Sequence, residues 1–150
     1  MNESQQFPFL EMKDKTGRSL LRPLMPITLR ADNDTITTTA LLDTGADVNV
    51  MPYSIGIALG GIWDELPVVF GLSGNLSQQP ARGLVVNAKV GRFEPVRLAF
   101  AWSHSDEARL LLGQMNFFRN YSGTLFSLVF QNTSVNFGTN WDGFSLRWLR

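Results

Sequence analysis

The stretch ALLDTGADVNVM, residues 40–51, places a carboxylate inside an otherwise apolar segment. Residues 40–42 form a continuous small-to-large apolar run, which is typical of a strand end buried on both faces. Asp43 follows this run directly, and because an isolated buried charge is very costly, its carboxylate must be hydrogen-bonded, paired or neutral. Gly45 allows a tight turn with positive φ and lets a ligand approach the backbone closely. Asp-Thr-Gly alone also fits an ordinary polar β-turn, so the surrounding segments decide between the two interpretations.

The residues before this stretch predict a β-hairpin that leads into it. Met25, Ile27 and Leu29 alternate with other residues, which is the period of a strand with one face against a core. Residues 31–34 are a turn cluster, and residues 35–39 are dense in β-branched side chains that favour strands. Asp43 is therefore expected at the end of the second strand of this hairpin.

The remainder of the chain has the same character. Apolar residues alternate over 84–90 and again over 96–102, with a turn predicted at Gly91-Arg92 between them. Further strands are predicted at residues 68–70, 110–113 and 124–130, short helices at 52–59 and 114–120, and a polar loop at 103–107. Many short strands with few helices predict an all-β fold with minor α content, either a closed barrel or a sandwich.

Composition and charge limit the class of protein. The chain has 150 residues, of which 44% are hydrophobic and 17% charged, and this predicts one globular domain over residues 1–150. Lys and Arg together number 13, as do Asp and Glu, so no basic surface predicts binding to nucleic acid. No apolar run approaches the ~20 residues of a membrane span, and the N-terminus does not resemble a signal peptide. We expect a cytoplasmic protein with no membrane partner.

The residue types present also exclude several chemistries. The chain has no Cys, which excludes disulfides, thiolate zinc sites and a cysteine nucleophile. His104 is the single histidine and lies in a polar loop, and no Gly-x-Ser-x-Gly motif is present, so a serine hydrolase is disfavoured. Asp32-Asn33-Asp34 begins like a calcium loop but lacks the later Gly and Glu, so it predicts a turn. We expect no metal and no cofactor.

A second motif lies later in the chain. Leu111-Leu112-Gly113 is an apolar pair and a glycine that close a predicted strand. Together with residues 40–47, it resembles the active-site loop and the hydrophobic-hydrophobic-Gly element of retropepsin-like aspartic proteases, of the single-domain bacterial type related to retroviral proteases. The resemblance covers about residues 22–130 and implies a closed barrel with a flap hairpin, for which residues 69–79 have the right place.

The two ends of the chain have no counterpart in this resemblance. Residues 1–21 and 131–150 remain of unassigned packing. The second of these segments is rich in aromatic residues, so we expect it to pack on its own domain or on a partner.

The resemblance also implies roles for individual residues. Asp43 would be the catalytic aspartate, and Thr44 would hydrogen-bond across a dimer axis. The residues expected to support the active-site loop are Thr44, Gly45, Leu112 and Gly113, and those expected to contact substrate are Gly45, Ala46, Asp47, Ser73 and Gly74. Gln114 departs from the family, since retroviral enzymes tend to have Arg or Asn there.

The chemistry of an aspartic protease needs two carboxylates that share one proton. One acts as general base on a water molecule, and the other, protonated, polarises the scissile carbonyl. The chain contains Asp-Thr-Gly once, and Asp142-Gly143 lacks both the Thr and the preceding buried run. A two-fold symmetric homodimer would supply the second Asp43. We therefore expect an aspartic endopeptidase that acts as a homodimer on peptide or protein substrates.

Two other functions fit the same residues. The chain could be a catalytically silent module that binds peptides in the same groove. It could also be an assembly protein that uses its aromatic C-terminal segment as an interaction surface. Intact Asp43-Thr44-Gly45 favours the enzyme over both.

Overall fold

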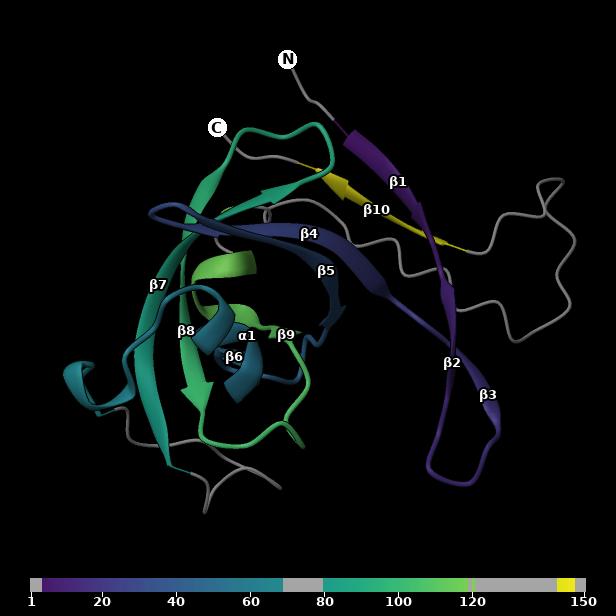
Figure 1. Ribbon diagram of the computed structural model, residues 1–150. Helices are drawn as coiled ribbons and strands as arrows, with labels where there is room; N and C mark the ends of the chain where they lie inside the picture. Colours follow the sequence, from purple (N-terminus) through teal and green to yellow (C-terminus); the bar gives the residue numbers. More distant parts are fainter. Residues whose placement is uncertain (1–3, 69–79, 119, 121–142, 148–150) are drawn as a thin grey trace, which may run out of the picture.

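Six strands close into a barrel in the computed structural model, which describes residues 4–68, 80–118, 120 and 143–147 (Figure 1). For Ser4 and residues 143–147 it describes the backbone alone. The barrel strands are β4 (Leu24–Ala31), β5 (Asp34–Leu42), β6 (Asn49–Met51), β7 (Ala81–Val90), β8 (Val96–Ser103) and β9 (Leu111–Leu112). Their order around the barrel is β4-β5-β9-β6-β8-β7. The predicted all-β fold with few short helices is confirmed, and the barrel form is the correct one of the two expected.

The hairpin of β4 and β5 forms because its inward positions are apolar at every second residue. Met25, Ile27 and Leu29 are almost completely buried, while the residues between them are more exposed. Ala31 pairs with Asp34, which leaves a two-residue turn, and Asp32 adopts a positive φ of 48°. Asp tolerates this left-handed conformation better than most residues do. The hairpin predicted from the alternation is therefore present.

A second hairpin, of β7 and β8, pairs with the first through β7 and β4. Val86, Ala88 and Val90 are buried on β7, as are Leu98 and Phe100 on β8. The far end of β8 is buried on both faces, because Ala101, Trp102 and Ser103 are all inaccessible. The prediction that Ser103 begins a polar loop is therefore wrong, since the residue ends β8 opposite Ala81.

The two shortest barrel strands, β6 and β9, lie between β5 of the first hairpin and β8 of the second. β9 lies between β5, to which it is parallel, and β6, to which it is antiparallel. β6 in turn pairs with β8 in parallel. Because β9 separates β5 from β6, the loop that joins those two strands must cross the end of β9. This loop contains residues 43–48.

One helix packs against a buried tryptophan. Helix α1 (Tyr53–Ala58) begins after Pro52 and ends before Gly60, which has a φ of 79°, as the sequence predicts. Trp102 is fully buried, and its indole nitrogen donates to the backbone oxygen of Tyr53 at 3.0 Å. A Cβ on Gly56 would overlap the Trp102 ring. Glycine at this position is therefore what lets the helix approach β8 closely. A short turn, η1 (Trp63–Glu65), follows.

The predicted helix at residues 114–120 is wrong in its first turn. Element η3 (Gln114–Phe118) contains Met115 with a ψ of 128° and Asn116 with a φ of 74°, neither of which is helical. The Asn116 side-chain oxygen accepts a hydrogen bond from the Ala99 N–H at 2.8 Å. This tertiary contact competes with helical winding, which is how Asn commonly acts outside helix interiors.

The terminal segments form two further two-stranded sheets. β1 (Ser4–Pro8) pairs antiparallel with β10 (Gly143–Arg147), with Phe7 opposite Phe144. Phe7 is buried in the main core, and the Gln5 side chain accepts a hydrogen bond from Arg92 N–H at 3.1 Å. The expected packing of the C-terminal segment on its own domain thus holds for the backbone of β10. Of the predicted strand at 68–70, the structure describes Val68, which forms an isolated antiparallel bridge with Arg82. Residues 69–70 and the predicted strand at 124–130 lie outside the described residues.

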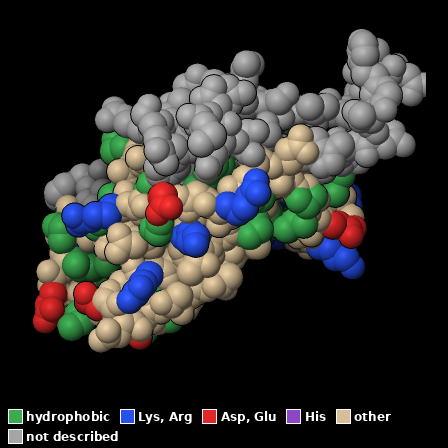
Figure 2. Space-filling view, turned by 90° about the horizontal axis from the view of Figure 1, so that it is seen from above, with side chains coloured by type: hydrophobic (Ala, Val, Ile, Leu, Met, Phe, Trp, Pro, Cys, Tyr) green, Lys and Arg blue, Asp and Glu red, His purple; other side chains and the backbone are tan. Residues whose placement is uncertain are grey.

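The second terminal sheet is the hairpin of β2 (Leu10–Lys13) and β3 (Ser19–Arg22), which extends away from the barrel (Figure 1). On the face seen from above in Figure 2, Lys and Arg side chains stand apart from one another rather than gathered into one patch. Within the described part of the chain, no helix is long and apolar enough to cross a membrane.

Candidate active site

Asp43 lies immediately after β5, at the mouth of the barrel. Its N–H donates to the Leu112 oxygen at 3.0 Å, which continues the pairing of β5 with β9 by one residue. Its side chain is half-buried, and Oδ1 accepts a hydrogen bond from the Gly45 N–H at 2.9 Å. Ala46 N–H closes the turn on the Asp43 backbone oxygen at 3.1 Å. The carboxylate is therefore hydrogen-bonded and held in one orientation, as the cost of burying a charge requires.

Gly45 serves this turn by its small size rather than by its backbone conformation. Gly45 does not use the positive φ that glycine allows, because it is not among the described residues with φ in the left-handed region. A Cβ on Gly45 would lie 3.3 Å from Asp43 Oδ1. That distance is tighter than an ordinary contact, so a side chain there would push on the carboxylate. The glycine instead leaves room for the short N–H to carboxylate bond.

Gly113 supports the active-site loop from beneath. A Cβ on this residue would lie 2.6 Å from the backbone oxygens of both Ala46 and Val48. Two backbone N–H groups just after it also donate to the loop: Gln114 to Ala46 at 2.8 Å and Met115 to Asp47 at 2.7 Å. The structure thus brings together Asp43–Asp47, Leu112 and Gly113, which lie far apart in the sequence.

Gln114, the position that departs from the family, has a specific contact. Its side-chain nitrogen donates to the backbone oxygen of Thr44 at 2.8 Å. This amide therefore secures the loop without an ion pair. The Thr44 and Asp47 residues themselves are exposed, so their side chains are accessible to another molecule.

Asn49 is a supporting residue that the sequence analysis did not single out. It is fully buried, its side-chain oxygen accepts from the Gly113 N–H at 2.9 Å, and its side-chain nitrogen donates to the Ala99 oxygen at 2.9 Å. It therefore ties β8 to the segment beneath the active-site loop. The signal available in the sequence is an amide within the apolar run Val48-Asn49-Val50-Met51, since a buried polar group needs partners.

Replacing Asn49 by Ala should lower the free energy of unfolding by about 2 kcal/mol, because the buried Gly113 N–H loses its acceptor. Chemical denaturation measures this change. Asn87→Ala is the control, since Asn87 is exposed on β7 and a substitution there should change stability by less than about 0.5 kcal/mol. Equal denaturation midpoints for the two variants would contradict the role assigned to Asn49.

His104 lies in a cluster of aromatic rings at one end of the barrel. It is exposed, as expected of a loop residue, but its ring stacks on Trp63 with a centroid distance of 4.4 Å. Tyr53 meets it edge-on at 4.8 Å. Nearby, a backbone hydrogen bond from Ser54 lowers the pKa of Asp106. These contacts give His104 a packing role beside α1.

The structure does not describe every predicted site residue. Ser73 and Gly74, with the proposed flap at residues 69–79, lie outside the described residues. Asp32 and Asn33 form the turn between β4 and β5, and Asp34 is the first residue of β5. Among the residues that the structure describes, no group of three or more His, Asp or Glu side chains is placed to hold a metal ion.

Comparison with known proteins agrees with this architecture. No family model matches the chain, and no curated protein does. Among solved structures, the chain is similar to the crystal structure of a retropepsin-like aspartic protease from Rickettsia conorii, with a TM-score of 0.60 and 15% sequence identity. The fold is retropepsin-like. The similarity covers 99% of this chain and 94% of that chain.

Proposed function

We propose that the chain is one protomer of a homodimeric aspartic endopeptidase with Asp43 as its catalytic residue. The observation that carries this proposal is the Asp43 carboxylate, oriented by the Gly45 N–H on a loop that Gly113 supports from beneath. The retropepsin-like fold of the barrel adds to it, because the structural neighbour is an aspartic protease.

Two Asp43 carboxylates, one from each copy, would divide the chemistry between them. The ionised carboxylate takes a proton from a water molecule, whose oxygen attacks the carbonyl carbon of the peptide bond. The protonated carboxyl group donates a hydrogen bond to the carbonyl oxygen as charge develops there. When the C–N bond breaks, the departing amine receives a proton from the dyad. The products are a carboxylic acid and an amine, and no cofactor is consumed.

The accessible parts of the loop fit an extended peptide substrate. Gly45, Thr44 and Asp47 are exposed beside Asp43, and Ala46 is half-buried between them. We propose that the Gly45 and Asp47 residues bind substrate main chain, which would make binding tolerant of substrate sequence. Thr44 would contact the loop of the second copy. Ser73 and Gly74 would close over the substrate from the other side.

Incubating the chain with a diverse peptide library tests the activity directly. Mass spectrometry should detect cleavage at internal peptide bonds without added metal or cofactor. The same cleavage sites should appear in the presence of a chelator. Intact peptides after prolonged incubation of folded protein at high concentration would count against the enzyme and favour a peptide-binding module.

Dilution should reduce activity more than in proportion to concentration. One chain supplies one Asp43, so the active species is the dimer, and the specific activity should fall once the concentration drops below the dimer dissociation constant. Sedimentation equilibrium measures that constant independently, and the two midpoints should agree. Constant specific activity down to concentrations at which the protein sediments as a monomer would contradict the shared dyad.

A further inference from the structure

The β2–β3 hairpin exposes apolar side chains on a sheet of only two strands. Leu10 pairs with Arg22 and Lys13 with Ser19, so the two strands are fully matched. All the residues of β3 are exposed, including Leu21 at 57% and Leu20 at 37%. Figure 1 shows the hairpin standing out from the barrel. An isolated two-stranded hairpin is marginally stable in water, so packing against another surface would stabilise this projecting hairpin.

Hydrogen bonds to the Asp14 side chain hold the turn of this hairpin in one conformation. The Asp14 side chain accepts hydrogen bonds from the Thr16 N–H at 2.8 Å and the Thr16 hydroxyl at 2.6 Å. It also accepts from Arg18, through the backbone N–H and the guanidinium, each at 3.0 Å. The hydrogen bond from the Thr16 side chain, with those from Arg18, lowers the pKa of Asp14 to about 2. Because the pKa is lowered, the stabilisation that these hydrogen bonds give to the hairpin turn is complete above the ordinary value of 3.8. It is lost as the pH falls towards 2.

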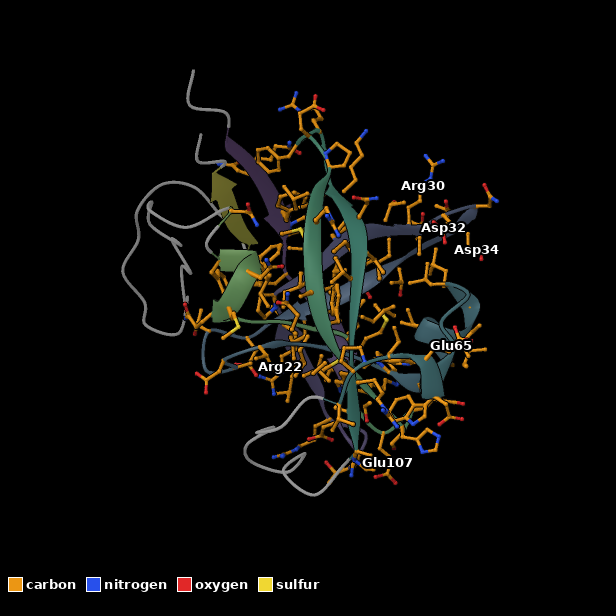
Figure 3. The ribbon with its side chains drawn as sticks, turned by 90° about the vertical axis from the view of Figure 1, so that its left-hand side faces the viewer. Arg22, Arg30, Asp32, Asp34, Glu65 and Glu107 are labelled. Carbon is orange, nitrogen blue, oxygen red and sulfur yellow. The ribbon has the colours of Figure 1, made fainter. Side chains whose placement is uncertain are left out.

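The base of the hairpin stands beside the candidate active site. Pro23, which follows β3, accepts a hydrogen bond from the Leu42 N–H at 3.0 Å, and Leu42 precedes Asp43. On the other side, Arg109 Nη1 contacts Met12 Sδ at 2.9 Å. Figure 3 shows Arg22, the last residue of the hairpin, away from the β4–β5 turn where Asp32 lies. The hairpin therefore leaves the barrel at the end that carries Asp43.

A second copy of the chain is the occupant that this placement favours. The site proposed above is incomplete until a second Asp43 comes within a few ångströms of the first. A strand of four residues spans about 13 Å, so the hairpin reaches well beyond its base at Pro23. A copy that docks at Asp43 therefore lies within reach of the hairpin.

We propose that the β2–β3 hairpin is an arm that packs against the second copy of the chain, with Leu21 as its main apolar contact. This inference rests on the proposed function, because it needs the dimer that brings two Asp43 residues together. It adds to that function a specific interface element from the N-terminal segment. Buried apolar anchors of this kind usually contribute much of the energy of an interface.

Leu21→Asp tests the arm, and Ile62→Asp is its matched control. Leu21 and Ile62 have the same exposed fraction, 57%, but Ile62 lies before η1 rather than on the hairpin. Sedimentation equilibrium should show that Leu21→Asp raises the dimer dissociation constant at least about tenfold, while Ile62→Asp leaves it unchanged. Thermal melting of dilute monomer should be the same for both variants, since each side chain is already exposed.

A second measurement avoids placing a charged side chain at residue 21. The chain has no Cys, so Leu21→Cys and Ile62→Cys each introduce a single thiol. Alkylation of Leu21→Cys should slow several-fold when the protein is concentrated enough to dimerise, whereas alkylation of Ile62→Cys should not change. Equal alkylation rates at both concentrations for Leu21→Cys would overturn the arm.

The remaining outcomes separate this inference from the proposed function. If the parent dimerises and cleaves peptides but Leu21→Asp dimerises equally well, the arm is wrong and the enzyme stands. If Leu21→Asp dimerises normally but loses cleavage of a folded protein and keeps cleavage of short peptides, the hairpin contacts substrate and the inference is overturned. If the parent is a fully active monomer, the arm and the shared dyad are both wrong.

Discussion

Replacing Asp43 by Asn should lower kcat/KM for peptide cleavage by about 1,000-fold or more, because the dyad loses its general base and its shared proton. The fold and the dimer should be unchanged. Asn is nearly isosteric with Asp, and its side-chain oxygen can still accept the hydrogen bond from the Gly45 N–H that orients the parent carboxylate at 2.9 Å. Steady-state kinetics on a cleaved library peptide measure the loss, and sedimentation and circular dichroism check the structure.

Asp32→Asn is the matched control for this substitution. Asp32 lies in the turn between β4 and β5 with a φ of 48°, and Asn adopts that conformation as readily as Asp does. The control therefore makes the same change of charge without strain, and it should cleave at the parental rate. If Asp43→Asn cleaves as fast as Asp32→Asn, Asp43 is not the catalytic residue.

Replacing Gly113 by Ala should lower the free energy of unfolding by at least about 3 kcal/mol, at the upper end of the usual cost of overpacking. The added Cβ would lie 2.6 Å from the backbone oxygens of Ala46 and Val48, and 2.9 Å from the Val48 carbonyl carbon. Backbone atoms cannot rotate away as a flexible side chain can. The active-site loop must therefore move, and a displacement of about 1 Å should reduce kcat about 100-fold.

Gly17→Ala separates this clash from the general cost of replacing glycine. Gly17 has a φ of 84° in the β2–β3 turn, and a Cβ there would meet nothing within 4 Å. Its replacement should cost about 1 kcal/mol from backbone strain alone. The specific activity of the folded protein should be unchanged when it is measured at concentrations that saturate the dimer, so that any effect on the hairpin as an arm does not enter. Denaturation and kinetics on both variants measure the difference. A Gly113→Ala variant as stable and active as Gly17→Ala would show that Gly113 does not support the loop.

The parts of the fold that could be predicted are those with a strong local period. Alternating apolar residues placed β4, β7 and β8, because a half-buried strand repeats every second residue. Pro52 and Gly60 marked the ends of α1 by their fixed or permissive backbone conformations. In each case the physical preference acts within a few residues, so the sequence alone carries it.

The predictions that were wrong depended on contacts between distant residues. Residues 114–120 were predicted to form a short helix, but Asn116 turns its side chain to the Ala99 N–H on β8 and takes a φ of 74°. Ser103 is polar and was assigned to a loop, but it is buried where β8 ends beside Ala81. Gly45 could have supplied a positive φ, but its role in the structure is to provide space beside the Asp43 carboxylate.

Some residues of the candidate site could be found from the sequence and others could not. Asp43 was found from the sequence because burying a carboxylate within an apolar run costs free energy, which indicates a functional role for it. Leu112 and Gly113 were found through a family resemblance, and the structure places Gly113 directly against the loop. Asn49 was missed, because the two groups it bonds, on Gly113 and Ala99, are brought to it by strand order rather than by sequence distance.

The sequence by itself determined that this chain forms an all-β domain with a carboxylate at a strand end, since apolar periodicity and the cost of a buried charge are local properties. Tertiary structure alone decided how that carboxylate is held. The parallel pairing of β5 with β9 brings Gly113 beneath Asp43–Asp47, and the pairing of β1 with β10 joins the two ends of the chain. Such contacts join residues separated by tens of positions, so no short-range preference specifies them, and closure of the barrel does.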